Sequence, residues 1–258
     1  MWDPSVYLSY AGERQRPFGD LLLRVGAEAP RAVVDLGCGP GTLTALLATR
    51  WPGARVTGVD SSPEMIAEAH ALATPVTFVE GDVRAWRPDP DTDVVVCNAT
   101  LQWVPGHEAL LTRWVAELPA GAWLAFQVPG NFDAPSHRAL RALAAEPEWR
   151  ERLGTVVRDA HPVLDPTGYA TLLHAAGCTV DAWETTYLHV LPVTEPGDQP
   201  VLRWMEGTAL RPVRAALDDA AWTEFRAALG ARLDRAYPPR DARVLFPFRR
   251  IFVVARVP

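Results

Sequence analysis

Three glycines fall within five residues directly after a short apolar run, at Gly37, Gly39 and Gly41. Asp35 stands two positions before the first of them, so the pattern is Asp-x-Gly-x-Gly-x-Gly. Glycine lets the backbone turn sharply and lets a ligand approach it closely. We therefore predict a ligand-binding turn between a strand and a helix, because a helix N-terminus offers free N–H groups and a positive dipole end.

The glycine spacing differs from the dinucleotide fingerprint Gly-x-Gly-x-x-Gly. Counted from Gly37 or from Gly39, the position of the third glycine holds a threonine, Thr42 or Thr44. The carboxylate of Asp35 would repel a diphosphate, whereas it suits a ligand with a cationic amino group. S-adenosyl-L-methionine is such a ligand, because its methionine end is a zwitterion next to a sulfonium.

Polar residues also stand at the ends of the next three apolar runs. Asp60 ends the second run, 23 residues after Gly37, where a carboxylate can accept hydrogen bonds from both ribose hydroxyls. Asp82 follows the third run, where a carboxylate can accept from an adenine amino group, and Asn98 follows the fourth. Ligands of open α/β sheets bind at the carboxyl ends of the strands, so we expect these residues to face one ligand.

Short apolar runs alternate with helical patterns over the first half of the chain. The runs lack the alternation of half-exposed strands and are typical of parallel strands buried on both faces. The predicted strands are residues 32–34, 56–59, 76–79, 94–97 and 123–126. The predicted helices between them are residues 43–50, 63–72 and 107–118, and Pro17 is predicted to open an earlier helix. This alternation predicts an α/β fold with an open parallel sheet.

The second half of the chain has a less regular pattern. Helices are predicted over residues 139–153 and 166–176, strands over 180–191 and 248–255, and a helical insertion over about 198–236. Arg250 and Arg256 lie on the last of these strands and are expected to be solvated or structural. We predict a single domain over 1–258, with an N-terminal helical lid (1–30), a cofactor-binding half (31–130) and a substrate-side half (131–258).

On these motifs the chain resembles the class I S-adenosylmethionine-dependent methyltransferases, most strongly over residues 30–130. It is more narrowly similar to members that methylate one carboxylate of trans-aconitate. The stretches that carry the narrower likeness are residues 2–8, 13–17, 35–41, 58–69, 98–103, 185–187, 207–212 and 246–256.

The resemblance implies a Rossmann-like, mostly parallel seven-stranded sheet flanked by helices, with a helical cap. It implies S-adenosyl-L-methionine as the cofactor and a small-molecule polycarboxylate, trans-aconitate above all, as the substrate. Cys38 is expected to contribute only its backbone. The residues expected at the cofactor are Asp35, Gly37, Cys38, Gly39, Gly41, Asp60, Ser61, Met65, Asp82, Val83 and Asn98.

The implied reaction is an in-line displacement at a sulfonium. A carboxylate has a pKa of about 4 and is already ionised near pH 7, so we expect no general base and no catalytic side chain beyond those that orient. Alignment of oxygen, methyl and sulfur at about 3 Å and exclusion of water would lower the barrier. Arginine forks are expected on the two spectator carboxylates only. The candidate substrate-binding residues are Tyr7, Arg14, Arg16, Gln102, Trp103, Tyr187, Arg211 and Arg249.

The composition excludes several other chemistries. All 25 basic residues are arginine, so neither a Schiff-base lysine nor a P-loop lysine is present. The net charge is −6 and no basic run occurs, which disfavours nucleic acid as a partner. Three widely spaced cysteines and six scattered histidines predict no disulfide framework and no metal site. We find no signal peptide and no apolar stretch of about 18 residues, so we expect a cytoplasmic protein without membrane contact. We also expect it to be a monomer or a weak dimer.

Three alternatives remain open. The first is a methyltransferase of the same fold that acts on another acceptor, such as a carrier-bound malonyl ester, a lipid or a natural product. The second is a nicotinamide oxidoreductase, which the glycine spacing opposes. The third is a non-catalytic S-adenosylmethionine sensor.

Overall fold

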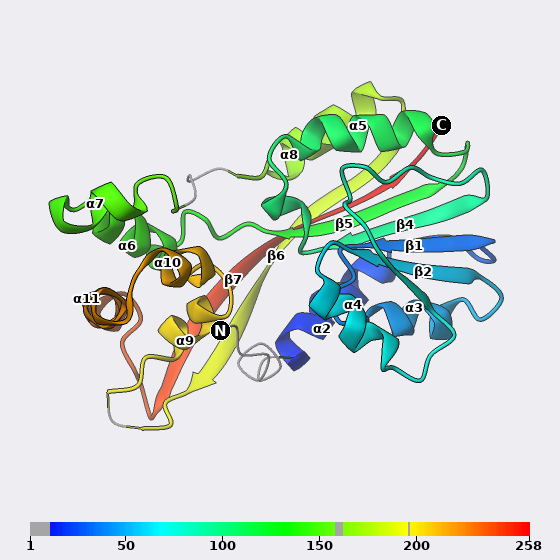
Figure 1. Ribbon diagram of the computed structural model, residues 1–258. Coiled ribbons are helices and arrows are strands. Elements are labelled where there is room, and N and C mark those ends of the chain that lie inside the picture. The colour runs from blue at the N-terminus through cyan, green and yellow to red at the C-terminus, as the bar shows by residue number, and fades with distance from the viewer. Residues whose placement is uncertain (1–10, 158–161, 196) are drawn as a thin grey trace. The chain divides into compact units, whose positions relative to one another are not determined.

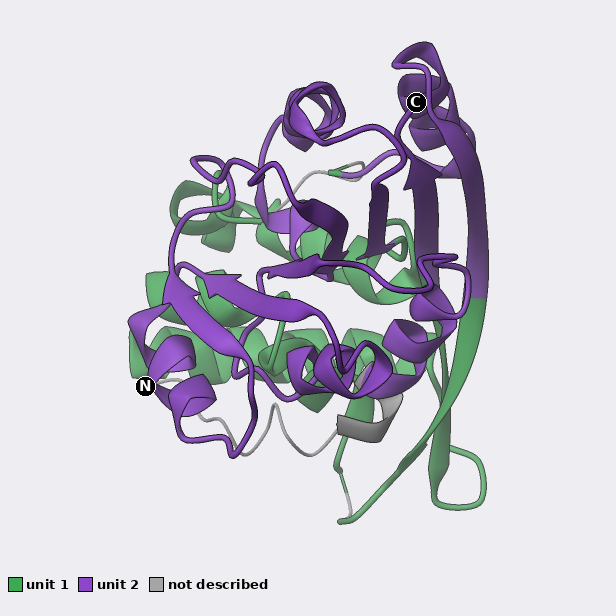
Figure 2. Ribbon diagram, turned by 90° about the vertical axis from the view of Figure 1, so that its right-hand side faces the viewer, with its two compact units in different colours: residues 1–13, 130–162, 186–249 green, residues 14–129, 163–185, 250–258 purple. Residues whose placement is uncertain are grey.

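A computed structural model describes residues 11–157, 162–195 and 197–258. The chain divides into two compact units (Figure 2). Unit 1 comprises residues 1–13, 130–162 and 186–249, and unit 2 comprises residues 14–129, 163–185 and 250–258.

The described residues form one seven-stranded sheet with the order β3-β2-β1-β4-β5-β7-β6 (Figure 1). The strands are β1 (Ala32–Leu36), β2 (Arg55–Asp60), β3 (Thr77–Glu80), β4 (Thr92–Asn98), β5 (Trp123–Pro129), β6 (Thr179–Pro192) and β7 (Arg243–Arg256). Strands β1 to β5 are parallel, and β7 pairs with β5 in the antiparallel direction. The predicted seven-stranded, mostly parallel sheet is confirmed. Its strand order reverses between β1 and β4, where open α/β sheets bind ligands.

Helices of unit 2 cover both faces of its part of the sheet (Figure 1). They are α2 (Ala11–Leu22), α3 (Thr44–Arg50), α4 (Pro63–His70), α5 (His107–Glu117) and α8 (Pro166–Ala175), and a 3₁₀ turn, η1, spans Leu101–Trp103. On the α5 and α8 side, Trp114 and Tyr169 are fully buried, and Tyr169 makes an edge contact with Phe126 of β5. On the other side, Phe18 and Leu21 of α2 are fully buried. Burial on both faces explains the continuous apolar runs of the parallel strands.

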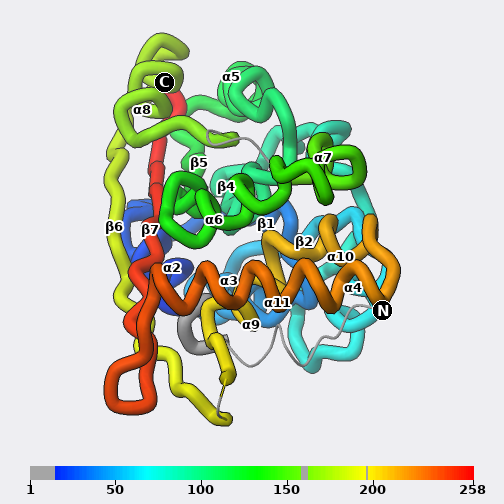
Figure 3. Tube along the Cα trace, turned by 90° about the vertical axis from the view of Figure 1, so that its left-hand side faces the viewer, coloured from blue at the N-terminus to red at the C-terminus, as the bar shows by residue number. Residues whose placement is uncertain are grey.

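Helices of unit 1 form around a separate core. They are α6 (Pro135–Ala144), α7 (Pro147–Leu153), α9 (Pro200–Glu206), α10 (Arg211–Ala216) and α11 (Asp219–Ala236). Trp149 of α7 packs edge-on against Phe225 of α11, with ring centroids 5.2 Å apart. Figure 3 shows α11 as the long helix of this unit, which follows the two short helices α9 and α10. The predicted insertion at about 198–236 is therefore helical.

Three boundary predictions are wrong. Pro17 lies inside α2 and does not open it, because burial of Phe18 and Leu21 outweighs the local preference of proline. The single helix predicted over 139–153 is two helices, since Pro147 forces the residue before it into an extended conformation. Strand β7 begins at Arg243 rather than at residue 248.

The described residues include no helix that combines the length and the apolar character needed to span a bilayer.

Candidate active site

The glycine turn after β1 has the backbone geometry that its sequence predicts. Gly37, Gly39 and Gly41 all adopt positive φ angles, of 80°, 56° and 77°. A Cβ atom on Gly37 would collide with the side chain of Thr100, and one on Gly41 would lie 2.5 Å from the ring of Phe78. A Cβ on Gly39 would meet nothing within 4 Å. Gly37 and Gly41 are thus required by packing, whereas Gly39 borders open space that a ligand can enter.

Asp60, at the end of β2, holds the glycine turn in place. Its Oδ2 accepts from the Gly39 N–H and its Oδ1 accepts from the Ser62 N–H, each at 2.9 Å. Each carboxylate oxygen has a second lone pair and can accept a further hydrogen bond from a ribose hydroxyl. Sequence reasoning missed this backbone-anchoring role. The sequence signal for this role was Ser62. It caps α4 by accepting from the Met65 N–H, and its own N–H donates to Asp60.

Asp35 is a buried carboxylate beneath the turn, with 3% of its surface exposed. The Thr44 hydroxyl donates to its Oδ2 at 2.6 Å, and its Oδ1 has no hydrogen-bond partner in the described part of the chain. Desolvation, with a smaller effect of Asp60, raises the pKa of Asp35 to about 7, and the Thr44 hydrogen bond opposes the rise. A cationic group bound next to Asp35 would restore its ionised form.

A second strained turn, after β4, touches the first. Ala99 has a positive φ of 55°, which a non-glycine residue rarely adopts. The Thr100 hydroxyl donates weakly to the Gly37 carbonyl at 3.4 Å, and the Gln102 amide donates to the Ala99 carbonyl at 2.5 Å. The carbonyl oxygens of the Asn98 and Gln102 side chains are buried and have no partner among the described residues. Backbone strain of this kind clusters at ligand sites.

The remaining predicted cofactor residues have varied surroundings. The Asp82 carboxylate accepts from the Arg84 guanidinium and from the Arg84 N–H, and the guanidinium beside it lowers the pKa of Asp82. Burial raises the pKa of the Cys38 thiol, which keeps it protonated and unreactive. Ser61 is exposed, Met65 is half-buried in the first turn of α4, and Val83 is buried in the core.

The predicted substrate residues are spread over both units. Tyr7 lies outside the described residues, as does the side chain of Arg14. In unit 2, Arg16 is exposed, Gln102 is buried and Trp103 is 46% exposed. These predicted roles stay predictions.

Three predicted substrate residues belong to unit 1. Tyr187 is buried on β6, and Arg211 is exposed at the start of α10. Arg249 is half-buried on β7 and donates to the Gly130 carbonyl at 3.1 Å. The substrate roles of these residues also stay predictions.

Within the described ranges, no group of three or more His, Cys, Asp or Glu side chains is arranged to hold a metal ion. The carboxyl ends of β1 and β4, with the turn after β4, present a set of buried hydrogen-bond acceptors. Asp35 Oδ1 on β1, Asn98 Oδ1 at the end of β4 and Gln102 Oε1 in the turn after β4 all lack a donor in the described structure. Thr100 of the turn after β4 packs against Gly37 of the glycine turn. Buried polar atoms are normally hydrogen-bonded, so the three acceptors indicate a ligand that brings several N–H or O–H donors.

Comparison with known proteins agrees with this geometry. A family model described as a methyltransferase domain matches residues 10–182. A trans-aconitate 2-methyltransferase of Mycolicibacterium gilvum (strain PYR-GCK) is 59% identical over 259 residues, covering 100% of this chain and 99% of the relative. A protein of the same name from Mycobacterium sp. (strain KMS) is 58% identical over 258 residues, covering 99% of both chains.

Solved structures show the same fold at low sequence identity. The YcgJ protein from Bacillus subtilis has a TM-score of 0.59 at 13% identity and covers 93% of this chain and 97% of its own. A phosphoethanolamine N-methyltransferase 2 of Haemonchus contortus, in complex with S-adenosyl-L-methionine, has a TM-score of 0.53 at 17% identity. The match covers 94% of this chain and 52% of that one.

Proposed function

We propose that this chain, which belongs to the methyltransferase domain family, transfers a methyl group from S-adenosylmethionine to one carboxylate of trans-aconitate, giving a monomethyl ester. The choice of acceptor follows the mycobacterial relatives, which share more than half of their residues with this chain and carry that activity in their name.

The single observation that carries the cofactor assignment is the set of unpartnered acceptors at the carboxyl ends of β1 and β4 and in the turn after β4. Asp35 suits the ammonium group of the methionine end, and the open backbone of Gly39 lets that end approach the turn. Asp60 suits the ribose hydroxyls, because each of its oxygens keeps one lone pair. When bound, S-adenosylmethionine supplies a methyl group on a positively charged sulfur.

The protein's contribution to the reaction is orientation. The acceptor carboxylate is ionised at neutral pH, so no residue has to remove a proton. The strained turn at Ala99 fixes the side chains of Asn98 and Gln102 at the edge of the sheet. Fixed hydrogen-bonding groups orient the bound molecules, and a fixed orientation favours in-line displacement. Exclusion of water strengthens the attraction between carboxylate and sulfonium.

The proposal is tested with methyl-labelled S-adenosylmethionine and a panel of di- and tricarboxylates. Transfer to trans-aconitate should give a base-labile label that is volatile after hydrolysis, because a methyl ester releases methanol. Transfer to a different class of acceptor, with none to any polycarboxylate, would overturn the acceptor assignment and leave the methyltransferase assignment intact.

A further inference from the structure

We propose that the side-chain amide of Gln127 donates a hydrogen bond to the carboxylate that receives the methyl group, at the oxygen that does not attack. This role rests on the carboxylate acceptor proposed above and assigns a residue that orients it. Gln127 belongs to unit 2, as do Asp35 and Asn98 at the proposed cofactor site.

The register of the sheet places Gln127 next to the proposed cofactor site. Gln127 of β5 pairs with Asn98 of β4, and Asp35 of β1 pairs with Val96, two residues before Asn98. Paired residues of neighbouring strands, and residues two apart along one strand, share a face of the sheet. The order on this face is therefore Asp35, Asn98 and Gln127, from β1 to β5. The opposite face carries core residues such as Phe126.

The distance across the sheet fits an acceptor at Gln127. Asp60 of β2 suits the ribose and Asp35 of β1 suits the ammonium group, so the acceptor has to come from the side of β4 and β5. Four bonds of about 1.5 Å separate the ammonium nitrogen from the sulfur, which spans roughly 5 Å. The methyl group, with an oxygen about 3 Å beyond it, adds roughly another 5 Å. Neighbouring strands are about 4.8 Å apart, so β5 lies about 10 Å from β1, as the acceptor should.

The Gln127 amide has an unused donor with a fixed direction. Gln127 is completely buried, and its Oε1 accepts from the Arg250 Nη1 at 2.6 Å. A guanidinium only donates, so the amide oxygen has to face Arg250 and the NH₂ group has to face away from it. The Gln127 Nε2 has no hydrogen-bond partner among the described residues. Buried donors are normally hydrogen-bonded, which indicates that the bound substrate supplies the acceptor.

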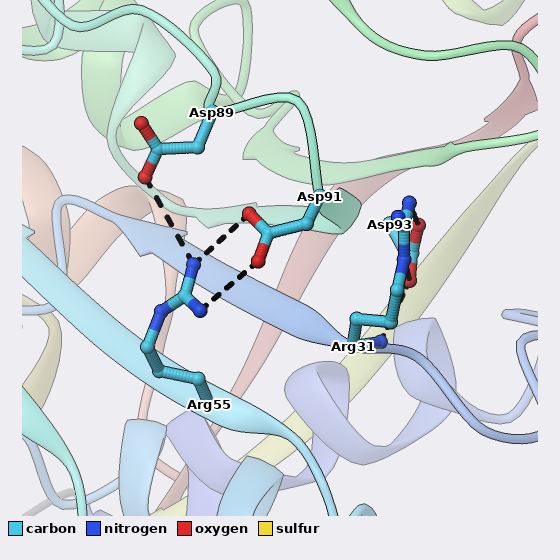
Figure 4. Close-up of polar contacts among 5 residues, drawn as sticks. All are labelled: Arg31, Arg55, Asp89, Asp91 and Asp93. Atoms are coloured by element: carbon cyan, nitrogen blue, oxygen red, sulfur yellow. Dashed lines mark hydrogen bonds and ion pairs between the residues drawn. The ribbon is translucent and has the colours of Figure 1, made fainter.

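A neutral amide suits the reacting carboxylate better than an arginine does. Figure 4 shows two carboxylates held by arginine: the Arg31 Nη2 lies 2.6 Å from an Asp93 oxygen, and the Arg55 Nη2 lies 3.0 Å from an Asp91 oxygen. In each pair the hydrogen bond from the guanidinium lowers the pKa of the carboxyl group. A less basic oxygen is a weaker nucleophile, so an arginine on the reacting carboxylate would slow its attack. An amide has no net charge and orients the group with a smaller loss.

In this arrangement the second oxygen of the same carboxylate attacks the methyl carbon in line with the carbon–sulfur bond. The oxygen–carbon bond forms as the carbon–sulfur bond breaks, and the electron pair of the broken bond returns to sulfur, which becomes neutral. No proton moves. The Gln127 amide contributes by holding the neighbouring oxygen, which keeps the attacking one aligned.

The first test is Gln127→Glu, which keeps the shape of the side chain and replaces its donor. One oxygen of the new carboxylate can still accept from Arg250, whereas the other takes the place of Nε2 and repels an acceptor carboxylate. We expect kcat/KM for trans-aconitate to fall at least about 100-fold, with the Kd of S-adenosylhomocysteine changed less than about threefold. An unchanged kcat/KM would overturn the inference.

The matched variant is Gln127→Met, which has a similar length and neither donates nor accepts a strong hydrogen bond. If Gln127 only held Arg250 in place, Gln127→Met would be impaired and Gln127→Glu would not, because only glutamate keeps an acceptor for the Arg250 Nη1. We expect both variants to be impaired, and Gln127→Glu to be the worse of the two because it adds repulsion. The reverse order would contradict the assigned role.

The second test needs no active variant, so it also decides the question if a substitution prevents folding. The chain has four glutamines, so selective labelling of their side chains with nitrogen-15 gives four amide signals in NMR spectra. Adding trans-aconitate to the complex with S-adenosylhomocysteine should shift the Gln127 amide protons downfield, because they bond an anionic oxygen. The Gln199 amide already donates to Asp234 and serves as the internal reference. Bound trans-aconitate without a shift at Gln127 would refute the contact.

The third test uses dicarboxylate analogues that each lack one carboxylate of trans-aconitate. Gln127→Glu should lose a similar factor of kcat/KM on every acceptor that the wild type esterifies. Full activity on one analogue would assign Gln127 to a spectator carboxylate and overturn the inference. A wild type that esterifies trans-aconitate, with none of these effects at Gln127, would overturn this inference and leave the proposed function intact. A wild type that esterifies no polycarboxylate would overturn both.

Discussion

Replacing Asp35 by asparagine should make the unliganded protein more stable at alkaline pH. Burial raises the pKa of Asp35 from 3.8 to about 7. The folded protein therefore binds a proton that the unfolded chain has lost between about pH 4 and pH 7, and the unfolding free energy falls as pH rises through this range. A shift of about 3 units at 1.36 kcal/mol per unit corresponds to roughly 4 kcal/mol at pH 8. Asparagine has no charge to bury and avoids this loss.

The assay is urea denaturation of unliganded wild type and Asp35→Asn at several pH values from 5 to 8. The difference in unfolding free energy should grow in favour of the variant by about 1.4 kcal/mol per pH unit up to about pH 6.5, and then level off. The matched control is Asp181→Asn, which removes an exposed carboxylate paired with Arg24. A difference between Asp35→Asn and wild type that does not change with pH would refute the reasoning.

The same carboxylate should make cofactor binding depend on pH in the opposite direction. An ammonium group prefers the ionised form of Asp35, so the affinity of wild type for S-adenosylhomocysteine should rise up to tenfold per pH unit below about pH 7. Asp35→Asn should bind about 10- to 100-fold more weakly at pH 8 and show a flat profile. Calorimetric titrations across this pH range measure both effects, and parallel profiles for the two proteins would contradict the assignment.

Three further substitutions separate binding from folding. Gly39→Ala should destabilise the fold by only about 1–2 kcal/mol, because alanine disfavours the positive φ at this position. Its Cβ would enter the open space, so calorimetry should show S-adenosylhomocysteine binding weakened at least about tenfold. Wild-type affinity in this variant would argue against a ligand at Gly39. Thr44→Val removes the hydroxyl that donates to Asp35 and should lower the unfolding free energy by about 1.5–3 kcal/mol at pH 8, and by less at pH 5, where the carboxyl is protonated. Equal losses in denaturation at both pH values would speak against a charged Asp35. Tyr169→Phe breaks the buried 2.7 Å bond to His107 and should cost about 1–3 kcal/mol of stability with cofactor affinity unchanged; a loss of affinity would tie this helix pair to the site.

The fold could be predicted where a short stretch of sequence has an apolar pattern that reflects its burial. The parallel strands are buried on both faces, so each appears as a continuous apolar run next to a helical pattern. The start of β7 could not be found in this way. Its first residues alternate between buried Val244, Phe246 and Phe248 and exposed Leu245, so no continuous apolar run marks them. The break at Pro147 needed only the proline itself, since a proline restricts the residue before it.

The site could be predicted where its residues form a local sequence motif. Asp35 and the three glycines form a motif, and the positive φ angles of the glycines and the open backbone at Gly39 agree with it. The hold of Asp60 on the Gly39 N–H depends on how two separate segments meet, which no local pattern encodes.

The central claim is that the turn above Asp35 receives the ammonium group of S-adenosylmethionine. The most direct test is calorimetry at pH 8 with S-adenosylhomocysteine and with an analogue that lacks the amino group. The account predicts one saturable site for S-adenosylhomocysteine and binding at least about 100-fold weaker for the deaminated analogue. Equal affinity for the two compounds would contradict it.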